Sequence, residues 1–406
     1  MIESYLRDQF DWKTLLIMLV LLALGLISIY SATYDAGASE NFYKQVVFMG
    51  IGLFAMAGMM LIPFRTLQLL SYVLYFASLL LLAGVLIGGK TVSGSTSWFT
   101  LGPISVQPSE FMKLTTILAI ASFLSRSDVD LDRFKYLAGT LAFTLVPVFL
   151  ILLQPDIGTA LVYLLMVVPI VYWSGASGFM VIAIISPPLA AIAALFGLTP
   201  FLITIALIFT ALWVSKQNRF IAAIAFSVTV LIGVSLQYFH RTLPAYQQRR
   251  IEAFLDPHAD PLGAGYNVIQ STVAIGSGGL WGKGHLQGTQ TQLNFIPEQW
   301  TDFIFCVPGE EFGFVGALVV LMFLNLLLFR GVRIASTVKN RYASIAAIGI
   351  TTVLGIHTVI NIGMSVGLLP VIGIPLPFLS YGGSALISSM MMVGILMNFY
   401  ANRKEY

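Results

Sequence analysis

The chain has 406 residues, of which 58% are hydrophobic and only 10% are charged. Soluble globular domains carry about 25% charged residues, so water is not the main solvent of this protein. The small net charge of +3 gives no reason to expect a nucleic-acid partner, and the single cysteine, Cys306, excludes a disulfide framework and a thiolate metal site.

Apolar blocks along the chain are long enough to cross a hydrocarbon core of about 30 Å. The first block, 14–32, is longer than the apolar part of a cleaved signal peptide and lacks a clear small-residue cleavage site, so it is predicted to be the first span. The pattern predicts an all-α polytopic membrane protein with about 10–12 transmembrane helices, forming a single domain over residues 1–406. The predicted spans cover residues 14–32, 45–63, 67–88, 111–125, 136–153, 157–174, 179–197, 201–215, 220–238, 312–329, 343–369 and 384–400.

Basic residues are distributed unevenly between the two sides that these spans define. With the N-terminus inside, 14 of the 21 Lys and Arg residues lie in inner segments and six lie in outer segments. Short loops rich in Lys and Arg remain in the cytoplasm. The distribution therefore predicts cytoplasmic N- and C-termini and an even number of spans.

Two outer segments, 89–110 and 239–311, are too polar and too long to be simple connections. Loops longer than about 12–15 residues are usually functional or disordered. The second segment contains a predicted amphipathic helix that ends at the glycine-rich run 276–279, and it is expected to fold as a large extracytoplasmic cap. Val268, Ile269, Thr272 and Val273 are predicted to share one face of that helix.

Ionisable residues within membrane spans are costly, so each needs a partner or a task. Glu110 and Lys113 lie three residues apart on one helix face at the start of the span 111–125. They are predicted either to form an internal ion pair or to line a substrate cavity. Asp156, which opens the span 157–174, is predicted either to cap that helix or to face the same vestibule, because both carboxylates follow a Gln-Pro pair.

Asp302 is the third candidate carboxylate, and it lies among aromatic residues that include Trp300 and Phe303. Low-dielectric surroundings disfavour the charged form of an aspartate, which would raise its pKa toward the range of a general base. The alternative interpretation of Asp302 is the N-cap of a following helix. Glu310 and Glu311, further along the chain, are predicted to be structural.

A site on the outer face has no access to cytoplasmic ATP or nucleotide sugars, and the glycine-rich run 276–288 lacks the GxxxxGK[ST] pattern of a phosphate loop. A lipid-linked pyrophosphate donor would suit this face. Such a donor needs cations for its leaving diphosphate, and Lys90, Arg249, Arg250 and Lys283 could supply them. Composition alone also fits a transporter, which needs a cavity open alternately to both faces but no base.

Seven short motifs occur in order between residues 107 and 384: QPSE with Lys113, QPDIG, DPLGAGY followed by QS, GSGGLWGKG, TDFIF, EEFG and PLPFLSYGGS. Together they resemble the SEDS family (shape, elongation, division and sporulation), and most closely its elongation-type members. The family usually has ten spans. The resemblance therefore implies that residues 175–219 contain an inserted helical pair.

The resemblance implies a peptidoglycan glycosyltransferase of the bacterial inner membrane that polymerises lipid II during cell elongation, with its active site on the outer face. Asp302 would remove the proton from the 4-hydroxyl of the acceptor GlcNAc. That oxygen would attack C1 of the donor MurNAc with inversion, while undecaprenyl pyrophosphate leaves. The implied partners are a class B penicillin-binding protein that supplies transpeptidation, the elongation machinery and membrane lipid, without nucleic acid. No cofactor is evident, although a divalent cation, Mg or Mn, is compatible with the diphosphate.

The motifs also imply a set of substrate-binding residues beside Asp302. Glu110, Lys113 and Asp156 would line the central cavity, and Arg250 would contact the diphosphate. The remaining predicted members of the set are Lys90, Trp98, Lys283 and Ser380.

The chain departs from the family pattern in two places. Ser97 precedes Trp98 where arginine is usual, so either Lys90 supplies that charge or the contact is dispensable. Trp300 stands where histidine usually precedes Thr-Asp. Two other functions remain open: a lipid flippase, in which Asp302 is structural, and a non-catalytic scaffold for the penicillin-binding protein.

Overall fold

The computed structural model describes residues 9–92, 95–101, 104–214, 219–239, 260–261, 263, 265–297 and 299–404. Within these ranges, each of the twelve predicted spans coincides with one long helix. Nine helices in the described part of the chain are long and apolar enough to cross a membrane. They are α2 (Trp12–Tyr34), α3 (Ser39–Leu61), α4 (Phe64–Gly88), α6 (Phe134–Leu152), α8 (Gly178–Leu195), α10 (Arg219–Phe239), α15 (Gly313–Thr337), α16 (Arg341–Ser365) and α17 (Gly383–Ala401).

Three further helices, α5 (Pro108–Leu124), α7 (Ile157–Trp173) and α9 (Leu198–Val214), have 17 residues each. That length is the lower end of the range of about 17–25 residues for a spanning helix. The assignment of these three as spans stays a prediction. In α5 every residue except Phe111 and Phe123 is buried, because other helices surround it on all sides.

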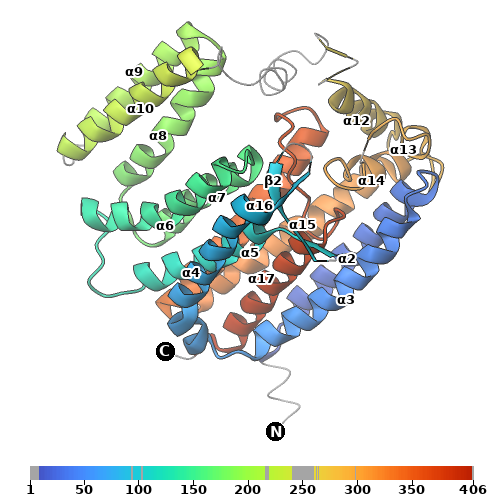
Figure 1. Ribbon diagram of the computed structural model, residues 1–406, viewed down its shortest axis with the longest axis horizontal. Coiled ribbons are helices and arrows are strands. Elements are labelled where there is room, and N and C mark those ends of the chain that lie inside the picture. Colours follow the sequence, from blue (N-terminus) through green and yellow to red (C-terminus); the bar gives the residue numbers. More distant parts are fainter. Residues whose placement is uncertain are drawn as a thin grey trace.

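The bundle is layered from a buried centre to an apolar outside. α5, α16 and α17 lie in the centre (Figure 1), and 72% of the apolar stretch of α16 is buried, compared with 17% for α3 and 28% for α4. Large apolar side chains on these outer helices, such as Phe54 and Ile87, are 84% and 94% exposed. Such a surface is unfavourable in water and suits lipid.

The helices α8, α9 and α10 form a group at one side of the molecule (Figure 1), where α8 contacts α7. Within the group, Ser186 of α8 and Thr229 of α10 share a buried hydrogen bond of 2.9 Å. The predicted helical pair in residues 175–219 corresponds to α8 and α9. Its origin as an insertion stays a prediction.

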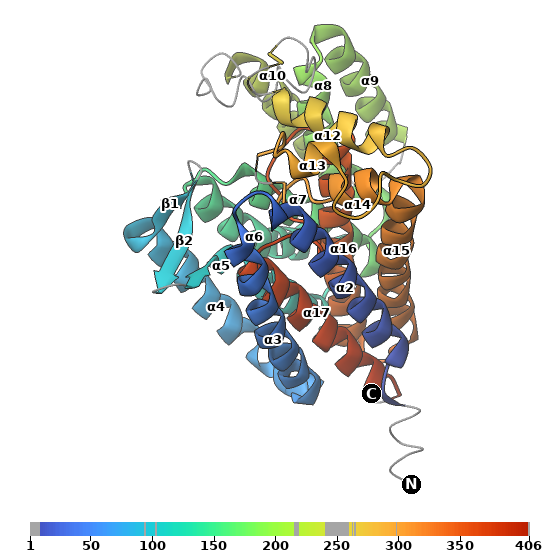
Figure 2. The same ribbon diagram turned by 90° about the vertical axis from the view of Figure 1, so that its right-hand side faces the viewer.

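The described part of the segment 239–311 packs against the end of the bundle that lies opposite both termini (Figure 2). It contains α12 (Tyr266–Ser277), α13 (Thr289–Gln292) and α14 (Cys306–Glu311). We call the described residues 265–311 the cap. The helix predicted before the glycine-rich run is α12.

Of the four residues predicted to share one face of α12, only Val268 is buried. The buried residues are Val268, Ser271 and Ala274, whereas Val273 is 47% exposed. Ser271 Oγ donates a hydrogen bond of 2.8 Å to the main-chain oxygen of Ser365 on α16. This polar contact and the small Ala274 set the rotation of the helix, which apolar periodicity did not predict.

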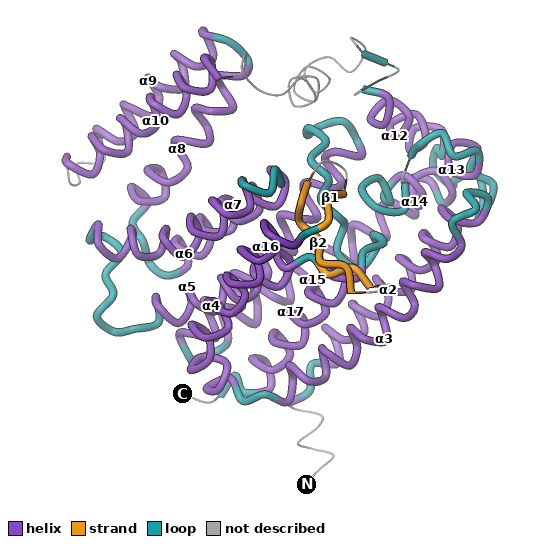
Figure 3. The backbone as a smooth tube through the Cα atoms, viewed as in Figure 1, coloured by secondary structure: helices purple, strands orange, loops and turns teal. Residues whose placement is uncertain are grey.

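Residues 90–92, 95–101 and 104–106 form a three-stranded antiparallel sheet (Figure 3), which corrects the all-α prediction. The strands are β1 (Lys90–Val92), β2 (Ser95–Leu101) and β3 (Ile104–Val106). β-Branched and aromatic residues are frequent in these strands, and such residues favour a pleated, half-buried surface. The sheet rests on α4 and α5 beside the starts of the central helices.

Candidate functional site

The α16–α17 connector, residues 366–382, runs through the bundle without forming a helix or a strand. Two glycines let the connector lie close to α2 and α7. A Cβ on Gly25 of α2 would collide with the main-chain oxygen of Phe378, and a Cβ on Gly158 of α7 would collide with that of Ile372. Irregular backbone at membrane depth is tolerated only where protein buries it or where it lines a cavity. The connector side chains that are at most 3% exposed are Ile374, Leu376, Phe378 and Leu379.

Gln45 of α3 forms hydrogen bonds with main-chain groups of the connector that have no helical partners. Its Nε2 donates to the main-chain oxygen of Ser380 at 3.1 Å, and its Oε1 accepts from the main-chain nitrogen of Gly382 at 3.2 Å. Gln45 is 2% exposed, so both of its polar ends are used within the protein. This side chain fixes the connector to α3.

The segment that carries Asp302 is fastened to the same connector. Ser380 Oγ donates to the main-chain oxygen of Thr301 at 2.6 Å, and the main-chain nitrogen of Tyr381 donates to the oxygen of Trp300 at 2.8 Å. The predicted residues Asp302 and Ser380 therefore lie close together, because Ser380 binds the backbone of the residue that precedes Asp302.

Asn361 of α16 adds a second attachment. Its Nδ2 donates to the main-chain oxygens of Asp302 and Ile374, each at 2.8 Å. On the side-chain side, a Cβ placed on Gly373 would lie 3.4 Å from Oδ2 of Asp302. The carboxylate therefore lies against the connector, at a position where Gly373 adopts a φ of +70°.

The capping interpretation of Asp302 is wrong, because the N-cap of α14 is Phe305. The residues that follow Asp302 are buried, with Phe303 2% and Ile304 0% exposed, while Asp302 itself is partly exposed. Its backbone is thus anchored on an apolar base and its side chain lies near the protein surface. This arrangement suits a carboxylate that meets a ligand.

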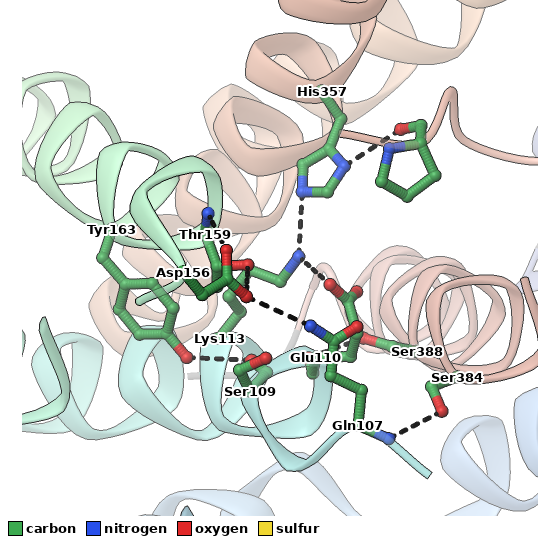
Figure 4. Close-up of polar contacts among 11 residues, drawn as sticks. Gln107, Ser109, Glu110, Lys113, Asp156, Thr159, Tyr163, His357, Ser384 and Ser388 are labelled. Atoms are coloured by element: carbon green, nitrogen blue, oxygen red, sulfur yellow. Dashed lines mark hydrogen bonds and ion pairs between the residues drawn. The ribbon is translucent and has the colours of Figure 1, made fainter. Parts of the chain in front are cut away.

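Glu110 and Lys113 form the predicted ion pair inside the bundle, with Nζ and Oε1 2.7 Å apart (Figure 4). Lys113 Nζ also lies 2.8 Å from Nε2 of His357, whose Nδ1 lies 3.2 Å from the main-chain oxygen of Pro375. Because a carbonyl oxygen only accepts, Nδ1 carries the proton, and Nε2 of the neutral ring accepts from the lysine.

Asp156 lies beside this ion pair and caps α7 (Figure 4). It accepts from the main-chain nitrogen and the Oγ1 of Thr159 at 3.0 and 2.8 Å. Gln107 Nε2 donates to its second oxygen at 3.3 Å. The two Gln-Pro-acid helix starts are therefore in contact, which brings Glu110, Lys113 and Asp156 together.

His357 and Asn361 connect these two groups of residues, since they lie four residues apart on one face of α16. His357 joins the ion pair to Pro375, and Asn361 joins the neighbouring Ile374 to Asp302. The sequence analysis assigned neither residue a role. The signal was present, because two polar side chains one turn apart in an apolar span need partners inside the protein.

The structure brings Lys90 and Trp98 together, since they are paired across β1 and β2. Lys90 is exposed, so its ammonium is accessible from the surface above the bundle. Ser97 is 2% exposed and accepts a hydrogen bond of 3.1 Å from Ser95 Oγ. A buried serine in this place cannot itself supply the charge of the arginine that is usual in the family.

Lys283 lies within the cap and pairs with Glu310 at 2.7 Å. Glu310, fully buried, also accepts from the main-chain nitrogens of Gln290 and Thr291 at 2.9 Å. Burial by itself raises the pKa of this carboxyl, but the hydrogen bonds from Lys283, Thr291 and the backbone outweigh it, so the pKa of Glu310 is lowered. The cap therefore already uses the charge of Lys283.

Glu311 has a similar structural role. It accepts from Ser31 of α2, from the main-chain nitrogen of Leu286 at 3.2 Å, and contacts His285 Nδ1 at 3.0 Å. The adjacent carboxylates thus tie the cap loop to α14 and α2. Their partners among the described residues include Lys283, His285, hydroxyl groups and backbone groups, which agrees with the predicted structural role.

Known proteins resemble this chain in sequence and in architecture. The FtsW/RodA/SpoVE family model, described as cell cycle protein, matches residues 12–221 and 196–405. The chain belongs to this family. The resemblance drawn from the seven motifs is thereby confirmed.

Relatives within the FtsW/RodA/SpoVE family match the chain over almost its whole length. The peptidoglycan glycosyltransferase MrdB of Escherichia coli K12 is 38% identical over 399 residues, covering 98% of this chain and 95% of the relative. Stage V sporulation protein E of Bacillus subtilis is 35% identical and covers 96% of each. The peptidoglycan glycosyltransferase RodA of Treponema pallidum is 33% identical and covers 98% of each.

Solved structures of the family have the same fold. A chain from a peptidoglycan synthase complex that coordinates polymerization and crosslinking is 30% identical, with a TM-score of 0.75, and covers 98% of this chain and 99% of that chain. The rod shape determining protein RodA of Thermus thermophilus is 29% identical, with a TM-score of 0.65 and 98% coverage of both chains.

Arg249 and Arg250, predicted in this family member to contact a diphosphate, lie outside the described residues. The described ranges contain no group of three or more His, Cys, Asp or Glu side chains placed to hold a metal ion. The Mg or Mn that the sequence analysis allowed stays a prediction, and no step below uses a metal.

Proposed function

We propose that this chain is a peptidoglycan glycosyltransferase that polymerises lipid II in the bacterial inner membrane during cell elongation. Support comes from the relatives named peptidoglycan glycosyltransferase, one of them 38% identical over 98% of the chain. The observation that carries the assignment is the placement of Asp302. Asn361 and Ser380 hold the backbone of its segment, and Asn361 lies one helical turn from His357, which contacts Lys113.

In the proposed reaction, Asp302 accepts the proton from the 4-hydroxyl of the acceptor GlcNAc. The oxygen forms a bond to C1 of the donor MurNAc from the face opposite the leaving group, which inverts that centre. The bond between C1 and the pyrophosphate oxygen breaks, and undecaprenyl pyrophosphate leaves with its electron pair. A positioned general base typically contributes about 10²–10⁴-fold to such a rate.

The other predicted residues divide into two groups. Glu110, Lys113 and Asp156 lie close together in the bundle, and His357, which contacts Lys113, is linked to the connector at Pro375. Exposed Lys90 on the edge strand β1 and partly exposed Trp98 beside it on β2 are suited to the sugar and diphosphate of an incoming lipid. We place Arg250 at the leaving diphosphate, where a guanidinium can bind two oxygens at once.

We infer that the cap faces the outside of the cell and both termini face the cytoplasm, in line with the distribution of Lys and Arg. A solved relative belongs to a peptidoglycan synthase complex that coordinates polymerization and crosslinking. We propose a class B penicillin-binding protein as the corresponding partner, which crosslinks the strands that this chain makes within the elongation machinery.

The direct test is polymerisation of lipid II by the purified full chain, with glycan chains separated by gel electrophoresis. Asp302→Asn should reduce polymerisation by about 10²–10⁴-fold, the contribution of a general base. Glu40→Gln is the matched control, because Glu40 is an exposed carboxylate at the same end of the bundle and should leave the rate unchanged. Repeating the assay with a chelator tests the predicted Mg or Mn.

Each alternative function gives a different outcome. A flippase whose Asp302 is structural would move lipid II across a vesicle membrane without making glycan, and Asp302→Asn would not affect that movement. If the chain is only a scaffold, glycan synthesis in the presence of the penicillin-binding protein would survive Asp302→Asn. Full-length glycan at the wild-type rate from Asp302→Asn would end the proposal.

A further inference from the structure

A polar cavity of about 330 Å³ lies at the end of the bundle where both termini emerge, opposite the cap (Figure 2). It opens between the first turn of α2 and the last turns of α15 and α17. Its lining includes Asp11 and four basic side chains, those of Lys13, Arg330, Arg333 and Arg403. The volume falls within the range of about 300–1,000 Å³ that is typical of small-molecule sites.

Asp11 does not balance the charge of the other cations, because it forms an internal ion pair with Arg330. Arg330 Nη2 donates to its Oδ1 at 2.5 Å, and the carboxylate caps α2 by accepting from the main-chain nitrogen and Oγ1 of Thr14 at 3.2 and 2.6 Å. Asp11 is 2% and Arg330 9% exposed. This internal pair cancels the charge of Arg330.

Arg403 packs against an aromatic side chain of the cavity lining. The guanidinium carbon of Arg403 lies 4.0 Å from the ring centre of Tyr400, and its Nη1 donates to the main-chain oxygen of Tyr400 at 2.8 Å. Lys13 and Arg333 are exposed, and neither forms a salt bridge with any residue in the described ranges. Lys13 and Arg333 therefore present positive charge at the cavity that no salt bridge to the described residues balances.

We propose that this cavity binds the phosphate of an anionic phospholipid headgroup. Guanidinium groups match phosphate oxygens in pairs, and basic pockets between the cytoplasmic ends of membrane helices suit anionic headgroups. Trp12, 59% exposed and packed on Phe10, stands beside the cavity as an interfacial aromatic residue does. The proposal depends on the inward orientation of the termini and not on the role of Asp302.

A bound headgroup would connect helices that are far apart in the sequence. The cavity joins the N-terminal end of α2 to the C-terminal ends of α15 and α17, and α2 also contacts the cap through Ser31 and Glu311. A ligand that binds only the folded state raises its stability by mass action. The lipid is therefore expected to stabilise the whole bundle.

The test uses the full chain in nanodiscs of phosphatidylcholine with or without phosphatidylglycerol. Melting temperature is measured, and retained lipid is counted by native mass spectrometry. Phosphatidylglycerol should raise the Tm of the wild type, and retention should fall about fivefold for each cation removed in Lys13→Gln and Arg333→Gln. Lys135→Gln, which removes an exposed cation outside the cavity, should behave as the wild type.

Two further measurements separate the sources of phosphate and keep the test independent of folding. In detergent, inorganic phosphate should give a much smaller rise in Tm than phosphatidylglycerol. An equal rise that the double variant abolishes would identify a free-anion site and overturn the lipid assignment. Retention of phosphatidylglycerol by the wild type should fall with added salt. Equal retention by the double variant and the wild type would also overturn the proposal.

Discussion

Asn361 donates a 2.8 Å hydrogen bond from its side-chain amide to the main-chain oxygen of Asp302. A residue within a buried helix therefore positions the proposed catalytic base. The same amide binds the connector at Ile374 over 2.8 Å, so α16, the connector and the Asp302 segment meet at one side chain. Asn361 is 0% exposed, so both contacts lie inside the protein.

Asn361→Leu should impair both folding and catalysis. The change leaves two buried carbonyls without their donor, at a cost of about 1–3 kcal/mol each. A misplacement of about 1 Å in the Asp302 segment would lower polymerisation by about 100-fold. Asn325→Leu, at an exposed position of α15, is the control for the loss of an asparagine. Wild-type polymerisation by Asn361→Leu would show that this contact does not position the base.

The buried pair of Glu110 and Lys113 should be strongly coupled. Glu110→Gln or Lys113→Met alone leaves an uncompensated group in the bundle, which costs about 3–5 kcal/mol. Combining the two should recover much of that loss, as measured by denaturation in detergent. The exposed pair of Glu40 and Lys44 provides the comparison, with an expected coupling of about 0–1 kcal/mol. Additive effects at the buried pair would contradict the predicted coupling.

Gly158→Ala tests the close approach of α7 to the connector. A Cβ at Gly158 meets the main-chain oxygen of Ile372, which cannot move without shifting the connector, so a loss of about 1–3 kcal/mol in the free energy of unfolding is expected. Gly58→Ala in α3 meets nothing within 4 Å and should stabilise its helix by about 0.5–1 kcal/mol. Equal effects of the two substitutions would argue against the packing of the connector.

The stability of the cap should depend on pH through Glu310. Its pKa in the folded protein is lowered from the ordinary value of 4.5, so the carboxylate contributes stability that is fully present above pH 4.5. That contribution is lost as the pH falls through the lower folded-state pKa, because protonation removes the interactions with Lys283 and Thr291. The protection of residues 283–292 against hydrogen exchange, corrected for the intrinsic pH dependence of exchange, should therefore fall on acidification below pH 4.5.

Glu310→Gln should remove this pH dependence and accelerate exchange at neutral pH. The exposed residue Glu40 again supplies the control, since Glu40→Gln should preserve the acid response of the cap. A cap whose exchange responds to acid equally with and without Glu310 would assign the pH dependence to another group.

The positions of the long helices were predictable from the sequence, and so was the contact between Glu110 and Lys113. Both depend on local properties: the hydropathy of contiguous residues, and a spacing of three on one helix face. The sheet of residues 90–106 and the rotation of α12 were not predicted correctly. Short strands gain their stability from pairing, and Ser271 determines which face of α12 is buried through its bond to Ser365, 94 residues away.

The sequence by itself determined a membrane protein of the FtsW/RodA/SpoVE family, because apolar blocks and ordered motifs are read along the chain. Only the tertiary structure decided which polar residues act together. Lys113 meets His357 across 244 residues, and Asn361 meets Asp302 across 59. Such pairs form only when packed helices bring distant segments together and exclude solvent, so that each buried polar group must find a partner within the protein.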